Sequence, residues 1–178
     1  MIIIYLYLIS FSLIGYGMII SRYLSINVNC FGIYGILGIT FLGFISYSSS
    51  LFINHNMIFN SIILFIGLSL FLFNSISINN FKKELFLLCI VCFITIIFVL
   101  VAKNHDDFPY YHFPYASLLT EYSHPIGIGI LNNGFRSPSS IFFISSMFYL
   151  PKSGFFLFHL VPAFILIFSN IIFLKMIF

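Results

Sequence analysis

The stretch LFLLCIVCFITIIFVLVA, from Leu85 to Ala102, decides the fold of this chain. It contains no charged residue, and its length is close to the apolar span of about twenty residues that crosses a bilayer. Cys89 and Cys92 form a CxxC pattern inside it, but no second ligand pair lies nearby and hydrocarbon disfavours thiolates. We therefore interpret both cysteines as small packing residues of a transmembrane helix.

Five further apolar runs flank this stretch, and together they predict an all-α, polytopic transmembrane helical protein with about six apolar segments. These runs cover residues 1–20, 31–53, 57–78, 138–150 and 155–178. The run 138–150 would extend only about 20 Å as a helix against a bilayer core of about 30 Å, so we expect it to be tilted or re-entrant. The last run reaches the final residue without a polar tail, and we expect an N-terminal part of a longer polypeptide.

This pattern divides the chain into three parts. Residues 1–102 should form four transmembrane helices, and residues 103–139 should form a polar loop. Residues 140–178 should add one short and one full transmembrane helix. The composition agrees, because 61% of the 178 residues are hydrophobic and 6% are charged, whereas soluble domains carry about a quarter charged residues. The net charge of +3 is scattered, which argues against a nucleic-acid partner and leaves membrane lipid as the expected surrounding.

The positive charges in the short loops predict the orientation in the membrane. Arg22 follows the first run, and Lys82 and Lys83 lie between the third and fourth. Both loops fall on one side if each run crosses once, and the positive-inside rule makes that side the cytoplasm. The loop of residues 103–139 should then lie outside the cytoplasmic (inner) membrane.

This polar loop gathers most of the ionisable residues of the chain. It holds three of the four acidic residues and three of the five histidines: Asp106, Asp107, Glu121, His105, His112 and His124, together with Lys103 and Arg136. Such clusters at a membrane boundary are typical of functional sites. The alternative is that charges gather in the longest loop because water is there.

A short amphipathic helix is expected in the middle of the loop. Tyr115, Leu118, Leu119 and Tyr122 recur at helical spacing and form one apolar stripe. Thr120, with Ser117 and Glu121, should face the other way. Pro114 suits the first turn, and the helix should lie along the outer membrane interface.

Two readings are open for Arg136. The pair Ser137–Pro138 predicts the cap and first position of a helix, whose N–H groups and positive dipole end beside a guanidinium would bind phosphate. The other reading is an ordinary cap with an arginine that reaches the interface.

Asp107 has three possible roles. It can cap a helix before Pro109, act as a general base, or ligate a divalent metal together with Asp106 and His112. A metal ion would need more oxygen ligands than the sequence displays, so we assign no metal site and keep Asp106 and Asp107 as candidates only. A carboxylate that accepts a hydroxyl proton needs fewer helpers.

The loop resembles multi-spanning bacterial membrane proteins of the C-type glycosyltransferase superfamily. The resemblance lies in Asp107-Phe-Pro-Tyr-Tyr111-His112, then Glu121-Tyr122, a Pro-Ile-Gly connector and Phe135-Arg-Ser-Pro-Ser-Ser140, and covers about residues 85–148. It is closest to a poorly characterised bacterial branch with an Asp-x-x-x-Tyr-His loop. The resemblance implies a polyprenyl-phosphate sugar as donor and Asp107 as the catalytic acidic residue. The superfamily commonly has this loop after its first helix, whereas three apolar runs precede the fourth span here.

We therefore expect an enzyme that transfers a sugar from a polyprenyl-phosphate carrier to an acceptor on the outer side of the membrane. Asp107 and His112 would be catalytic, and the substrate and its phosphate would contact Arg136, Tyr111, Glu121 and Lys103. No cofactor is assigned, and the requirement for a divalent metal stays open. The alternatives are a fragment of a transporter or flippase, and a non-catalytic membrane subunit. The apolar runs carry few charges, which favours the enzyme over the transporter.

Overall fold

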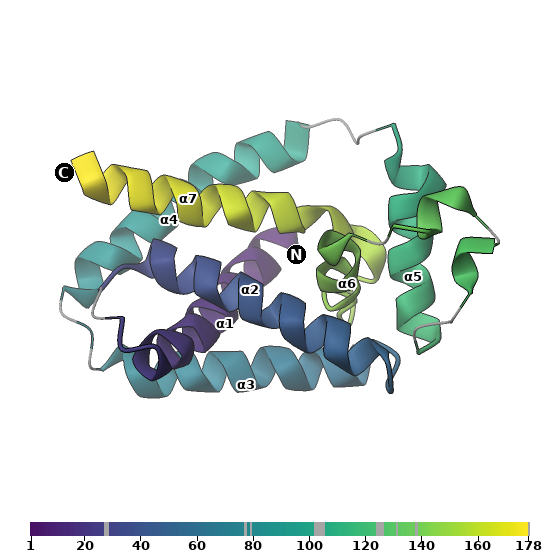
Figure 1. The fold of residues 1–178 in the computed structure, drawn as a ribbon. Coiled ribbons are helices and arrows are strands. Elements are labelled where there is room, and N and C mark those ends of the chain that lie inside the picture. The colour runs from purple at the N-terminus through teal and green to yellow at the C-terminus, as the bar shows by residue number, and fades with distance from the viewer. Residues whose placement is uncertain are drawn as a thin grey trace. The chain divides into compact units, whose positions relative to one another are not determined.

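The structure of the protein is a computed structural model, and its described part is almost entirely helical (Figure 1). It describes residues 1–26, 29–76, 78, 80–101, 106–123, 127–130, 132–137 and 139–177. Within these ranges there is no strand, and only an isolated bridge joins Leu150 and Gly154. The expected all-α class is therefore confirmed.

Within the part of the chain that the structure describes, five helical segments are long and apolar enough to cross a membrane. They are α1 (Ile2–Tyr23), α2 (Phe31–Ser50), α3 (Met57–Ser75), α4 (Phe81–Val101) and the segment Phe155–Ile177, which joins the 3₁₀ turn η4 (Phe155–Leu160) to α7 (Val161–Ile177). In lipid every backbone polar group must be satisfied within the protein, so these Ile- and Phe-rich runs become helices despite their β-branched residues. The chain is a membrane protein.

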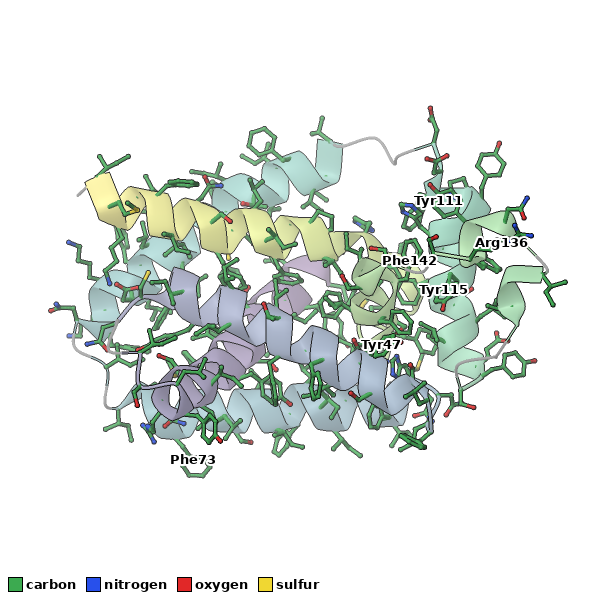
Figure 2. All side chains as sticks on the ribbon, in the orientation of Figure 1. Tyr47, Phe73, Tyr111, Tyr115, Arg136 and Phe142 are labelled. Atoms are coloured by element: carbon green, nitrogen blue, oxygen red, sulfur yellow. The ribbon has the colours of Figure 1, made fainter. Side chains whose placement is uncertain are left out.

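The exposed side chains of these helices suit a hydrocarbon surrounding. Phe73 on α3 is 78% exposed and points away from the helices around it, as Figure 2 shows. Phe93 and Phe98 on α4 are similarly exposed. In water such surfaces would cause association, whereas in a bilayer they face lipid tails.

Contacts divide the chain into two compact units, which cut across the linear order of the sequence. Unit 1 comprises Met1–Leu42, Ile63–Ala102 and Pro162–Phe178. Unit 2 comprises Gly43–Ile62 and Lys103–Val161. The polar loop thus packs with the end of α2, the start of α3 and the short α6, rather than standing alone.

Unit 1 is held together by close helix packing. A Cβ added at Gly17 of α1 would overlap the backbone of Tyr34 on α2, and one at Gly38 of α2 would overlap the backbone of Leu13 on α1. Small residues at such positions let transmembrane helices approach closely. The hydroxyl of Tyr16 on α1 donates to the carbonyl of Ile63 on α3 over 2.6 Å.

Unit 2 is built around α5 (Phe113–Glu121) and α6 (Ser140–Ser146). A π-helical turn, η1 (Phe108–His112), precedes α5, and two 3₁₀ turns, η2 (Ile128–Ile130) and η3 (Asn133–Phe135), connect α5 to α6. The core is aromatic and aliphatic, and its buried members are Tyr115, Leu119, Ile128, Phe135, Phe142 and Phe143. Figure 1 shows α5 and α6 in this unit.

The expected helix in the loop is confirmed, but its buried face differs from the predicted stripe. The buried residues of α5 are Tyr115, Ala116, Leu119 and Thr120. Tyr122 has an extended backbone because α5 ends at Glu121, and it is 58% exposed. The prediction that Tyr122 joins the stripe and that Thr120 faces away from it is therefore wrong.

The run 138–150 forms only the seven-residue α6. A helix of this length extends about 10 Å and is too short to cross a bilayer by itself. Its side chains pack inside unit 2 instead, and Phe142, Phe143 and Ile144 are all buried.

Candidate functional site

The candidate site lies in unit 2, where the segment after α4 forms η1 and runs directly into α5. The N–H of Phe113 donates to the carbonyl of Phe108, five residues earlier. Pro114, the next residue, has no N–H with which to continue an α-helical pattern. The wider turn follows from this proline, and π-helical turns are frequent at functional sites.

An acid and a phenol are paired across this turn. The hydroxyl of Tyr111 donates to Oδ2 of Asp107 over 3.0 Å, four residues apart along the chain. This hydrogen bond to the Asp107 carboxylate raises the pKa of Tyr111, with a smaller contribution from desolvation. The phenol therefore keeps its proton and remains a donor to the carboxylate.

The three readings of Asp107 can be compared with this geometry. Asp107 occupies the cap position of η1, but its side chain makes no capping hydrogen bond. Among the described residues, no group of three or more His, Cys, Asp or Glu side chains is arranged to hold a metal ion. Asp106 is exposed at the preceding position. The geometry around Asp107 is that of an oriented carboxylate.

His112 lies beside this pair within an aromatic cluster. Its ring centroid is 4.5 Å from that of Tyr111 and 4.8 Å from that of Phe142 on α6. Phe142 in turn contacts Tyr115, with 5.5 Å between the ring centroids. Figure 2 shows Tyr111, Phe142 and Tyr115 converging in this unit. The aromatic cluster limits the positions that the imidazole of His112 can take.

The turn that leads to Arg136 packs against the same segment. A Cβ added at Gly134 would lie 2.8 Å from Cβ of Tyr111, so only glycine fits there without a shift. The side chain of Asn132 donates to the carbonyl of Tyr110 over 3.4 Å. Arg136 follows η3, is exposed, and donates from Nε to the carbonyl of Gly129 over 3.4 Å.

The helix expected to begin at Ser137–Pro138 begins later. Ser139 is the cap residue of α6, and its Oγ accepts from the N–H of Ile141 over 3.3 Å. The prediction of a cap at Ser137 is therefore wrong, and Pro138 lies outside the described residues. Any contribution of Arg136 to anion binding thus rests on its guanidinium and the turn before it.

The remaining predicted residues do not join Asp107. Glu121 lies fourteen residues after Asp107, at the far end of the nine-residue α5, which extends about 13 Å. Its carbonyl accepts from the side chain of Asn54 over 3.2 Å. Lys103 lies outside the described residues. The structure thus brings Asp107, Tyr111 and His112 together, with the turn before Arg136 packed against Tyr111.

A polar network that sequence reasoning missed supports α5 and α6. His55, fully buried, contacts Oγ of Ser146 through Nδ1 at 2.6 Å and Oγ of Ser49 through Nε2 at 2.9 Å. The backbone N–H of His55 donates to the carbonyl of Leu119 over 2.8 Å. Burial lowers the pKa of His55 to about 4, so the ring is neutral near pH 7. The polar triplet Asn54-His55-Asn56 between two apolar runs is the sequence feature that could have indicated this network.

Sequence reasoning also missed a buried acid in unit 1. Glu84 on α4 is 4% exposed, accepts from the N–H of Phe31 over 2.8 Å, and forms an ion pair with Lys175 on α7. Glu84 is the one acidic residue of the sequence outside the polar loop, and this isolated position is the sequence feature that could have indicated a buried ion pair.

The three cysteines of the chain, Cys30, Cys89 and Cys92, are free thiols. Cys92 is fully buried and Cys89 is half-buried on α4. Among the described residues they belong to no metal-binding group. The burial of Cys30 and Cys92 supports the interpretation of these cysteines as packing residues.

Comparison with known proteins places the chain in one family. No curated protein and no solved structure matches the chain. One family model, described as a domain of unknown function (DUF8201), matches residues 1–178 and so covers the whole sequence. The chain therefore belongs to the DUF8201 family.

Proposed function

We propose that this protein acts in transferring a sugar from a polyprenyl-phosphate carrier to an acceptor on the outer side of the cytoplasmic membrane. The observation that carries the proposal is the hydrogen bond between Tyr111 and Asp107, which orients a carboxylate a few residues after a long apolar helix. The similarity of this loop to C-type glycosyltransferases, stated above, supports the same assignment.

The proposed reaction uses Asp107 as general base. The acceptor hydroxyl attacks the anomeric carbon of the sugar and its proton passes to the Asp107 carboxylate. A new C–O glycosidic bond forms, the bond between the anomeric carbon and the phosphate oxygen breaks, and the electron pair stays on the phosphate. Tyr111 fixes one carboxylate oxygen, and His112 positions the reacting groups within its aromatic surroundings.

Arg136 is the proposed partner of the leaving phosphate. Its guanidinium has five N–H donors, and the bond from Nε to Gly129 orients the group while its two NH₂ groups carry the other four. A planar guanidinium matches phosphate oxygens in pairs, which an ammonium group does not. Arg136 directly follows the turn that packs on Tyr111, the residue whose hydroxyl binds Asp107.

The test is a transfer assay in membranes that contain the protein, with a panel of polyprenyl-phosphate sugars. Wild-type membranes should release polyprenyl phosphate, and Arg136→Ala and Arg136→Lys should both lose at least about tenfold in donor affinity. Lys152→Ala is the matched control, because Lys152 is also an exposed cation of unit 2. Equal affinity in Arg136→Ala and Lys152→Ala would refute the role of Arg136, and no release from any donor would refute the transferase.

One observation favours a second candidate function, that of a transporter or flippase. The ion pair between Glu84 and Lys175 joins two helices that are long enough to span a membrane. Ionisable residues inside such helices often mark substrate paths. The double variant Glu84→Gln with Lys175→Met removes both charges together. It should leave sugar transfer intact under the first proposal and abolish lipid-linked substrate movement under the second.

A further inference from the structure

A pocket of about 580 Å³ lies inside unit 1, between the start of α4 and the end of α7. In Figure 1 these two helices cross in projection, and the ion pair between Glu84 and Lys175 joins them. The pocket is far from Asp107 in the sequence and shares no lining residue with the site described above. Its volume is in the range of pockets that hold small ligands.

The polar part of the pocket has an excess of positive charge. Glu84 is satisfied, because Oε2 accepts from the N–H of Phe31 and Oε1 pairs with Lys175, which also donates to the carbonyl of Asn29. Lys83 also lines the pocket, and within the described part of the chain it has no ion-pair partner. The charges of Glu84 and Lys175 cancel, so the pocket has the net positive charge of Lys83.

Lys83 lies where a helix itself disfavours a cation. It is in the first turn of α4, next to the positive end of the helix dipole. An anion bound there would contact both a lysine and that positive end. The amide side chains of Asn29 and Asn80 line the same pocket and supply further hydrogen-bonding groups.

The other wall of the pocket is apolar and continues along the helix. Phe86 and Ile90 are one turn apart on α4, and they are 67% and 38% exposed. Phe93 and Ile97 extend the exposed apolar surface of α4 further from the charged end. A ligand that suits both parts has an anionic head and a long hydrocarbon chain.

We propose that this pocket binds an anionic phospholipid, with its phosphate on Lys83 and an acyl chain along Phe86 and Ile90. The positive-inside rule predicts that this end of unit 1 faces the cytoplasm, where Arg22 and Lys82 also lie. Basic pockets between transmembrane helices on that side bind anionic headgroups. The inference is independent of the proposed glycosyl transfer.

The test measures lipid retention by native mass spectrometry of the purified protein, with phosphatidylglycerol and phosphatidylcholine as probes. Wild-type protein should retain phosphatidylglycerol in preference to phosphatidylcholine. Lys83→Gln should weaken this retention about fivefold, the effect typical of one lysine at an anionic surface. Lys82→Gln is the matched control, because Lys82 is equally exposed, adjacent in sequence and outside the pocket. Equal losses of phosphatidylglycerol retention in Lys83→Gln and Lys82→Gln would refute the proposed site.

A second pair of variants tests the acyl chain. Phe86→Ala should weaken retention of phosphatidylglycerol, whereas Phe73→Ala, which removes a similarly exposed phenylalanine of α3 outside the pocket, should not. Inorganic phosphate is the remaining probe. If it displaces phosphatidylglycerol at millimolar concentration from wild-type protein and Phe86→Ala has no effect, the pocket binds a free anion and the lipid proposal fails. Equal retention of the two lipids by wild-type protein contradicts it as well.

Discussion

The hydroxyl of Tyr111 donates to Oδ2 of Asp107 over 3.0 Å, across the π-helical turn that precedes α5. This contact depends on two neighbours of different kinds. Pro114 cannot donate a backbone hydrogen bond, which accounts for the wide turn, and Gly134 leaves the space that Tyr111 occupies. The carboxylate is thus oriented with the help of residues before, within and after α5.

Replacing Tyr111 by phenylalanine should lower sugar transfer about tenfold. The variant keeps the ring packing on His112 and Phe142 but loses the hydrogen bond that orients Asp107. Initial rates in membranes, normalised to the amount of protein, measure the effect. Tyr110→Phe is the control, because the adjacent Tyr110 is 73% exposed. Equal rates for both variants would mean that the Tyr111 hydroxyl has no part in transfer.

Acidification should loosen unit 2 through His55. Because burial lowers its pKa to about 4 from the ordinary 6.5, the folded state binds fewer protons than the unfolded state between these pH values. The His55 contribution to stability is complete above pH 6.5 and is lost as the pH falls toward 4, by about 3 kcal/mol.

Thermal unfolding of the purified protein between pH 7 and pH 4 measures this loss. His55→Gln should show a smaller decrease in Tm over that range, since glutamine does not titrate. If the Tm of His55→Gln fell as steeply with pH as that of the wild type, groups other than His55 would cause the loss of stability.

The predicted orientation can be tested with single cysteines at Ser123 and Asn80, both exposed. The background would carry alanine at Cys30, Cys89 and Cys92. An impermeant thiol reagent applied to intact spheroplasts should label Ser123→Cys, and it should label Asn80→Cys only after the membrane is opened. The reverse labelling pattern would place the polar loop in the cytoplasm and would refute sugar transfer on the outer side of the membrane.

The helices could be predicted from the sequence because lipid leaves few alternatives for an apolar run. The helix at Phe113 was also predictable, since Pro114 marks a first turn. The start of α6 was not, because Ser137 and Ser139 are both capable caps and packing decides between them. Likewise the extended backbone at Tyr122 is a property of the tertiary structure.

The candidate site was predictable only in part. Asp107, Tyr111 and His112 are close in sequence, so their proximity in one turn follows from local structure. The pairing of Glu84 with Lys175 joins residues 91 positions apart, and hydrophobic periodicity in the sequence does not predict such a contact. Glu121 shares the loop with Asp107, but the length of α5 separates them.

The proposed role of Asp107 as general base can be tested with a single substitution. Asp107→Asn keeps the size of the side chain and an acceptor for Tyr111, but a neutral amide cannot take the proton of an acceptor hydroxyl. Sugar transfer in membranes should therefore fall by about 10²- to 10⁴-fold at equal protein level, while the exposed neighbouring Asp106→Asn should cost far less. Wild-type transfer by Asp107→Asn protein would contradict the account.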